Sequence, residues 1–319
     1  MRSRFTSKGL ITNSEEWYDV RSQVQQDMMR PKSALYYISD LEKIALDVTE
    51  VIEKESDQTG TLDIVKICQK YALEAVANIF LGSRLGTLSG KGDGQRLIEI
   101  SDVIGSTSQK LIFLPLWLLP YLPEYKKWIT YLEEAFDICN KHVTNAKANS
   151  TEESETIIAK LGRRCGSDSV IPTVMAIDAL MAGIDTTGTA AAFLLYHLAT
   201  NPGKQENLYQ EICDTIGPCG HLTESDLAKM RYMKAVQMES QRIQPSVWGT
   251  SRMFDKDLII NGYKIPAGTT VVRVGAFSSM DPENFREPEK FLPERWLRNH
   301  PDRHTADSFA NLPFGHGAR

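Results

Sequence analysis

The sequence has little of several features that direct a chain to particular classes of protein. Among its 319 residues are only five cysteines, an odd number, widely spaced and without a CxxC pair. This spacing does not indicate a zinc site or a disulfide framework, and a reducing compartment is the simplest interpretation. Basic residues are not in excess, because 36 Lys and Arg face 41 Asp and Glu and give a net charge of -5. A general nucleic-acid-binding protein is therefore not expected, and small molecules and proteins are the expected partners.

Long hydrophobic runs and a signal-peptide pattern are also missing. No run reaches the roughly 18 to 20 apolar residues that a membrane-spanning helix requires. The most apolar run covers residues 111–122 and is interrupted by two prolines. Trp117 and Tyr121 in this run, followed by Lys126 and Lys127, suit a segment that dips into a membrane interface. A buried helix end followed by a loop explains the same pattern equally well.

Hydrophobic residues recur at three- and four-residue spacing over most of residues 14–243, which predicts a mostly helical region. Clusters of Pro and Gly mark the breaks between the helices. The helices are expected at residues 14–28, 32–54, 62–81, 97–112, 124–147, 170–199, 202–216 and 230–243. Residues 90–94 and 149–155 are expected to be exposed loops.

The pattern changes after about residue 248. Residues 258–263, with Asn261-Gly262 at the turn, and residues 268–274 are typical of a short hairpin. From Asp281 onward the chain has little periodicity, which indicates an irregular but ordered loop. Because the sequence contains no internal repeat, low-complexity tract or clear linker, it favours one mostly helical domain with a small sheet.

Two pairs of residues lie at spacings that place their side chains on one face of a helix. Glu239 and Arg242 are three residues apart, and an isolated pair of this kind is usually a solvated ion pair. Trp17 and Arg21 are four residues apart, a spacing that an amphipathic surface helix also satisfies. Neither pair alone identifies a site.

Two further motifs contain glycine. Residues 182–187, Ala-Gly-Ile-Asp-Thr-Thr, lie inside the predicted helix 170–199. Gly and Thr loosen a helix, and a threonine hydroxyl can donate to the carbonyl four residues earlier. Residues 313–319, Pro-Phe-Gly-His-Gly-Ala-Arg, form a turn in which the glycines permit a left-handed backbone.

In their order and spacing these motifs resemble the cytochrome P450 family of heme-thiolate monooxygenases. Phe314, Gly315, Gly317 and Arg319 match the family's heme-binding turn, F-G-x-G-x-R-x-C, whose cysteine thiolate holds the iron. That cysteine would lie two residues beyond Arg319, so the resemblance implies no metal ligand in this sequence. His316 occupies a variable position of the motif and is not expected to replace the cysteine.

The resemblance extends from the helix that carries Trp17 to Arg319. It implies an incomplete cytochrome P450 fold, mainly α with a small β-sheet portion. Residues 1–319 would form a single partial domain, helical over about 14–243, with short strands and an irregular loop over about 248–319. Complete members continue beyond both ends of this part, so we expect residues 1–319 to be a fragment.

The resemblance also implies roles in oxygen activation, a reaction that consumes protons. Asp185 would carry protons from solvent, and Thr186 would position water or donate a proton. Ala182 and Gly183 would line a groove for dioxygen above the iron.

Other residues would hold the heme or the loop before it. Heme propionates are carboxylates, which arginine binds well. The expected cofactor contacts are Trp17, Arg21, Arg252, Phe314, Gly315 and Arg319. Glu239 and Arg242 would pair with Arg295 to hold the irregular loop, which is a structural role.

The implied activity is that of a heme-dependent monooxygenase that inserts one atom of dioxygen into a lipophilic, for example sterol-like, substrate. NADPH would supply the electrons indirectly, through a ferredoxin. Residues 16–25, and residues 114–117 together with 125–127, resemble the animal mitochondrial type, which lies on the matrix side of the mitochondrial inner membrane. Lys234 matches a basic position on the ferredoxin-docking helix, whereas Met238 stands where a second lysine is often found.

Alternatives remain for location and for function. The alternative location is the endoplasmic reticulum membrane, with NADPH-cytochrome reductase as the redox partner. The alternative function is that of a non-catalytic, heme-free remnant that binds a lipophile or a partner protein. Residues 1–319 alone are expected to show little or no catalysis and to expose apolar surface that favours aggregation.

Overall fold

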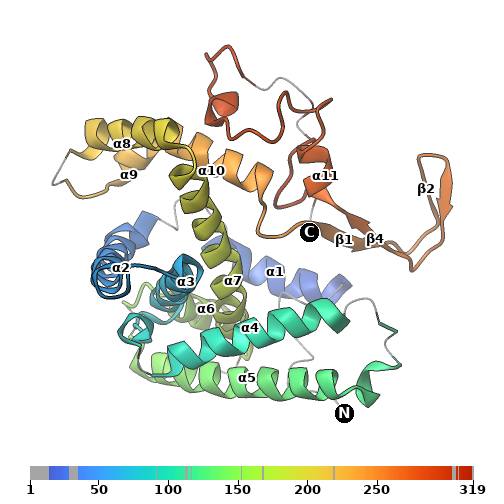
Figure 1. Ribbon diagram of the computed structural model, residues 1–319. Helices are drawn as coiled ribbons and strands as arrows, with labels where there is room; N and C mark the ends of the chain where they lie inside the picture. Colours follow the sequence, from blue (N-terminus) through green and yellow to red (C-terminus); the bar gives the residue numbers. More distant parts are fainter. Residues whose placement is uncertain are drawn as a thin grey trace. The chain divides into compact units, whose positions relative to one another are not determined.

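The computed structural model describes most of the chain. The described residues are 14–28, 35–90, 92–111, 114–115, 117–151, 153–166, 169–217, 220–303, 307 and 309–317. They are mainly helical, with two small antiparallel sheets (Figure 1), which confirms the predicted fold class. The chain divides into two compact units, residues 1–188 and 189–319, and the long helix α7 contributes residues to both.

The first unit is helical throughout its described part. Its helices are α1 (Ser14–Met28), α2 (Ile38–Thr59), α3 (Ile64–Leu81), α4 (Asp93–Leu111), α5 (Pro123–Asn149), α6 (Ile157–Cys165) and the first part of α7 (Ile171–Ala199), with 3-10 turns η2 (Thr87–Ser89) and η3 (Leu119–Tyr121). Helices α4 and α5 lie side by side (Figure 1). Leu73, Leu97, Ile158 and Leu180 are among the buried side chains of the core that these helices enclose.

Local signals determine the ends of α3 and α6. The Asp63 side chain accepts a hydrogen bond from the Lys66 backbone N–H at 3.1 Å, and Gly82 follows α3 with a left-handed φ of 67°. Thr156 caps α6 in the same way, through the backbone N–H of Ala159. The sequence analysis predicted α3 but missed α6, because α6 has only nine residues and its apolar face is recognisable only once it packs in the core.

The segment between α4 and α5 was assigned two alternatives, and the structure is compatible with both. Leu111, the last residue of α4, is buried, as expected for a buried helix end followed by a loop. Trp117 and Tyr121 expose 73% and 78% of their surface, which leaves them accessible to a membrane interface.

The second unit combines the end of α7 with shorter elements. These are α8 (Pro202–Ile216), α9 (Glu224–Lys229), α10 (Arg231–Ile243), β1 (Thr250–Met253), β2 (Leu258–Ile260), β3 (Tyr263–Ile265), β4 (Thr270–Arg273), α11 (Gly275–Ser279) and the 3-10 turn η4 (Pro293–Trp296). A small core gathers Leu198, Leu208, Tyr232, Val236 and Phe291. The described residues after Asp281 are irregular apart from η4, as the sequence predicted.

The strand pairing corrects the sequence-based prediction. Strands β2 and β3 form the hairpin, and Asn261 and Gly262 turn it with φ values of 50° and 83°. Residues 270–273 were expected in that hairpin, but β4 pairs antiparallel with β1, from Thr250↔Arg273 to Met253↔Thr270. Strand β1 was not predicted, because four residues are too few to show a clear alternation of apolar and polar side chains.

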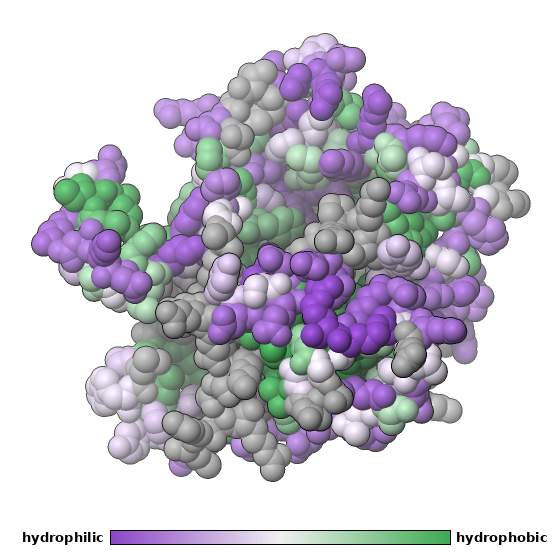
Figure 2. Space-filling view, turned by 180° about the vertical axis from the view of Figure 1, so that it is seen from behind, coloured by the Kyte–Doolittle hydropathy of each residue, from purple (hydrophilic) through white to green (hydrophobic). Residues whose placement is uncertain are grey.

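Two apolar features stand out among the described residues, one on the β2–β3 hairpin and one in α7. Figure 2 shows hydrophobic surface on the β2–β3 hairpin, where Ile259, Ile260 and Tyr263 are exposed. Among the described residues, α7 is long and apolar enough to cross a membrane by length and composition, which revises the expectation that no stretch qualifies. A core helix of a soluble protein passes the same test, so this is weak evidence.

Candidate functional site

Residues 182–187 lie on α7, which is a continuous α-helix through this motif. Ala182 and Thr186 are one turn apart and exposed, and the Thr186 hydroxyl donates to the Ala182 carbonyl oxygen at 2.8 Å. Gly183 faces α3, since an added Cβ would lie 2.7 Å from Cγ2 of Val76. The structure therefore brings Ala182 and Thr186 together and gives Gly183 a packing reason for lacking a side chain.

Asp185 points from α7 toward α3 and α4. Its Oδ1 accepts a hydrogen bond from Nε2 of Gln69 on α3 at 2.9 Å, and its Oδ2 accepts one from Oγ of Ser101 on α4 at 2.7 Å. Close packing of α3 on α7 supports these bonds, because a Cβ at Gly188 would lie 2.9 Å from the Gln69 Cα. The sequence analysis missed Gln69 and Ser101, although a buried polar residue on an otherwise apolar helix face is a signal that could have identified them.

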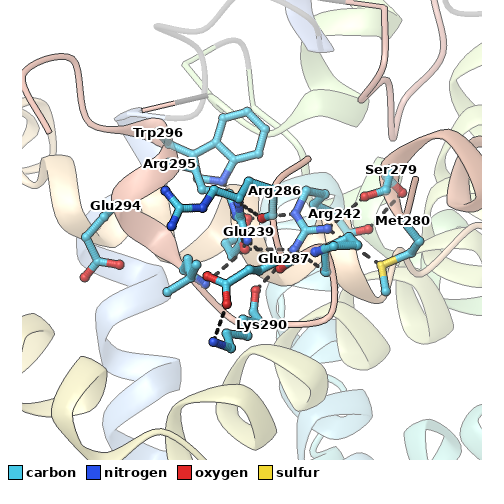
Figure 3. Close-up of polar contacts among 12 residues, drawn as sticks. Glu239, Arg242, Ser279, Met280, Arg286, Glu287, Lys290, Glu294, Arg295 and Trp296 are labelled. Carbon is cyan, nitrogen blue, oxygen red and sulfur yellow. Dashed lines mark hydrogen bonds and ion pairs between the residues drawn. The ribbon is translucent and has the colours of Figure 1, made fainter. Parts of the chain in front are cut away.

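In the second unit, Glu239 and Arg242 of α10 form a buried ion pair (Figure 3). Both side chains are fully buried, and the Arg242 Nε and Nη2 atoms each donate to a different carboxylate oxygen of Glu239 at 2.9 Å. Arg295 of η4 donates from Nε to Glu239 at 3.1 Å. The structure thus brings together the three residues that the sequence analysis assigned to one structural cluster.

The same cluster fixes the irregular loop that follows α11. The Glu239 carboxylate also accepts the backbone N–H of Leu292 at 3.0 Å and the indole N–H of Trp296 at 3.0 Å. Arg242 donates to the carbonyl oxygens of Ser279 at 2.8 Å and Pro288 at 2.7 Å. Arg295 donates to the carbonyl oxygens of residues 286 and 287. Buried carbonyl groups outside regular structure need such partners, so the cluster substitutes for secondary structure.

The turn that contains Gly315 lies beside β1. Gly315 and Gly317 have left-handed φ values of 74° and 104°, which a side chain would strain. A guanidinium nitrogen of Arg252 donates to the His316 carbonyl oxygen at 3.4 Å. Phe314 exposes 85% of its surface.

The remaining predicted contacts are spread over the chain. Trp17 and Arg21 lie on α1, one turn apart and half-buried. Arg319 lies outside the described residues. Guanidinium and indole N–H groups are suitable donors to an anionic cofactor such as heme, whose propionates need such partners. The residue types at these positions therefore fit a heme.

Three cysteines of the described part of the chain, Cys68, Cys139 and Cys165, do not suit an iron-ligating thiolate. Burial raises the pKa of the Cys68 thiol to about 11 and that of the Cys139 thiol to about 12. Burial also raises the pKa of Cys165, despite the lowering effect of Arg164. These three side chains are therefore neutral thiols near pH 7, whereas the thiolate is the form that binds metal.

Comparison with known proteins gives one family. The family model described as "Cytochrome P450" matches residues 1–319. The chain is 32% identical to "Probable cytochrome P450 49a1" of Drosophila melanogaster, over 98% of this chain and 57% of the relative. It is 32% identical to "Probable cytochrome P450 12a5, mitochondrial" of the same organism, over 98% and 63%. It is 29% identical to "25-hydroxyvitamin D-1 alpha hydroxylase, mitochondrial" of Rattus norvegicus, over 98% and 66%.

The alignments also give the share of each relative's length that this chain covers. The chain spans between 57% and 66% of the length of these three relatives. Nearly the whole of the chain takes part in each alignment. What the relatives bind or oxidise is therefore information about longer proteins.

Proposed function

Because this chain belongs to the cytochrome P450 family, we propose that the whole protein is a heme-dependent monooxygenase that oxidises a lipophilic substrate. The observation that carries the proposal is the family match over residues 1–319, which includes both the α7 motif and the glycine turn. We further propose that the two units are parts of one P450 domain. When bound, the heme supplies the iron at which dioxygen is reduced.

The heme contacts that we propose are those of the sequence analysis. Trp17, Arg21, Arg252 and Arg319 would neutralise and orient the propionates. Phe314 and Gly315 would form the turn beneath the ring, and the left-handed φ of Gly315 supports a tight turn there. Glu239, Arg242 and Arg295 would act through the loop that leads to this turn, as positioning residues.

The proton-handling residues that we propose are Asp185 and Thr186. Monooxygenation consumes one dioxygen, two electrons and two protons, places a hydroxyl group on the substrate and releases one water molecule. Asp185 would take up protons from solvent, and Thr186 would donate to water or oxygen on the exposed side of α7. The exposed Ala182–Thr186 face and the separate bonding of Asp185 support this division of roles.

The electrons would come from NADPH through a ferredoxin. Lys234 and Met238 are one turn apart on the exposed face of α10, where a small acidic protein could dock. Two of the three relatives above are named mitochondrial, which supports a mitochondrial location and this electron source. NADPH-cytochrome reductase and the endoplasmic reticulum are the alternative.

A membrane surface is the remaining partner that we propose. Trp117, just before η3, and Tyr121, its last residue, are both exposed, and aromatic residues of this kind favour the membrane interface. The location would be the matrix side of the mitochondrial inner membrane. A relative named as a vitamin D hydroxylase supports a lipophilic, for example sterol-like, substrate.

Reconstitution of the whole protein tests the proposal. Purified whole protein with heme should turn over a lipophile from a panel selected by spectral shift, and product should form faster with ferredoxin and its reductase than with NADPH-cytochrome reductase. Asp185→Asn should lower product formation by roughly 10² to 10⁴-fold while heme content stays unchanged. Heme incorporation without oxygenated product from any lipophile would contradict the proposed activity.

Residues 1–319 expressed alone provide the second candidate. The neutral, buried thiols of Cys68 and Cys139 favour a heme-free state for this part of the chain, because neither supplies a thiolate. We expect it to bind a lipophile at most, without oxygenation. Titration of residues 1–319 with hemin tests this, and a thiolate-type spectrum would contradict it.

A further inference from the structure

Five polar side chains form a continuous cluster across α3, α4 and α7 of the first unit. Asp185 is bonded to Gln69 and Ser101, as described above. Nε2 of Gln69 also donates to Oδ1 of Asp102 at 3.3 Å, and Asp102 forms an ion pair with Lys66. One amide group therefore bonds the α7 carboxylate and a second carboxylate on α4.

The cluster runs from the surface to the interior. The Asp102 and Lys66 side chains expose 43% and 38% of their surface. Gln69 and Ser101 expose only 4% and 3%. Oε1 of Gln69 is buried and has no hydrogen-bond partner among the described residues. A buried acceptor of this kind is a position at which an internal water would donate.

The bonding of the α7 residues divides them between two sides of the helix. Both oxygens of Asp185 are held by donors on α3 and α4, whereas the Thr186 hydroxyl is bonded to Ala182 of its own helix. Asp185 is therefore held away from Thr186 and toward the surface pair. These hydrogen bonds connect Asp185 to the surface pair through Gln69.

We propose that Gln69 and Ser101 are positioning residues that hold Asp185 for proton uptake, and that Asp102 is the surface carboxylate through which Asp185 exchanges protons with water. This inference rests on the proposed monooxygenase function and adds the solvent-side part of its proton path. The proton moves from water to Asp102 and then, through water bonded to Gln69, to Asp185.

Protonation of Asp185 changes the direction of one of its hydrogen bonds. An ionised carboxylate accepts hydrogen bonds at both oxygens, whereas a protonated carboxyl group carries an O–H donor on one of them. The Ser101 hydroxyl can accept this O–H while Gln69 still donates to the other oxygen, so both contacts survive protonation. The carboxyl group then passes the proton on toward Thr186, which returns Asp185 to its ionised, doubly bonded state.

The first test measures the contact in the whole protein without any turnover. Ser101→Ala, Asp185→Asn and the double variant are unfolded in urea and their midpoints are compared. Because the hydroxyl and the carboxylate are bonded to each other, the shift of the double variant should be clearly smaller than the two single shifts added together. Ser106→Ala removes an exposed hydroxyl from the same helix and should be additive with Asp185→Asn. Additive behaviour of Ser101→Ala would overturn the proposed holding of Asp185.

The second test measures proton delivery in the reconstituted enzyme. Gln69→Leu and Ser101→Ala should raise the solvent deuterium isotope effect on product formation and lower the product formed per electron pair by roughly three- to tenfold. Ser101→Thr keeps the hydroxyl and should restore both values. Asp102→Asn should shift the pH profile of product formation, whereas Glu99→Gln, a surface carboxylate three residues earlier on α4, should not.

These outcomes separate the inference from the proposed function. If the wild-type protein forms product and the Gln69, Ser101 and Asp102 variants leave the isotope effect and pH profile unchanged, the inference is wrong and the proposed function stands. If the wild-type protein binds heme but forms no product from any lipophile, the proposed function fails. The urea-unfolding comparison of the single and double variants then still decides whether Ser101 holds Asp185.

Discussion

Replacement of Glu239 by glutamine should be among the most destabilising single changes in this chain. The Glu239 carboxylate accepts five hydrogen bonds: two from Arg242, and one each from Arg295, Leu292 and Trp296. Glutamine has the same shape, but its NH₂ group would replace one of the two carboxylate oxygens. That NH₂ group would then face the N–H donors that now point at this oxygen. At least two bonds are lost, and two buried guanidinium groups lose their counter-charge.

The expected cost follows from this geometry. Removal of one partner from a buried ion pair costs about 3 to 5 kcal/mol, because the remaining charge stays buried without compensation. Typical domains are stable by about 5 to 15 kcal/mol, so Glu239→Gln removes a large share of the total. Arg242→Lys should also destabilise, because lysine keeps the charge but cannot donate to Glu239, Ser279 and Pro288 at once.

Urea unfolding of the whole protein, followed by far-UV circular dichroism, measures both variants. Glu206→Gln is the matched control, because Glu206 is an exposed residue of α8 that accepts one hydrogen bond from Gln210. This control should change the free energy of unfolding by no more than about 0.5 kcal/mol. A loss below about 1 kcal/mol for Glu239→Gln would show that the cluster does not hold the loop, and the reasoning would fail.

Three further predictions concern other parts of the chain. His197 stacks on Phe291 near Glu239 and Arg242, and burial lowers the pKa of its imidazole. The unfolded chain therefore binds a proton at His197 more readily than the folded chain does. The free energy of unfolding should fall below about pH 6.5, with a slope of up to about 1.4 kcal/mol per pH unit. His197→Asn should flatten that slope in urea titrations at several pH values, and an unchanged slope would refute the assignment. Met238→Lys should tighten ferredoxin binding in low salt, in a binding titration where Met238→Gln is the control. Ile259→Lys should raise the solubility of residues 1–319 without lowering the unfolding midpoint, because Ile259 is exposed on the β2–β3 hairpin.

Elements with local signals could be predicted from the sequence. Helix α3 has Asp63 before it and Gly82 after it, and the β2–β3 hairpin has Asn261-Gly262 at its turn. Each of these signals acts within a few residues, so it can be read without knowing the rest of the fold. The left-handed backbone at Gly315 was likewise predictable, because it depends on the glycine itself.

Features that depend on distant partners could not be predicted in this way. Strand β1 is defined by its pairing with β4, about twenty residues later in the chain, and β4 was assigned to the wrong partner for the same reason. The bonds from Gln69 and Ser101 to Asp185 join three helices, so periodicity alone gives no indication of them. The family resemblance predicted which residues matter, while the packing determined what Asp185 contacts.

The carbon monoxide spectrum of the reduced whole protein tests the central claim most directly. A cysteine thiolate bound to heme iron gives an absorption band at roughly 450 nm in this state. We expect that band at close to one heme per chain, and we expect it to be lost when the cysteine of the heme turn is replaced. A protein that folds, binds heme and lacks the band, or that keeps it after this replacement, would contradict the account.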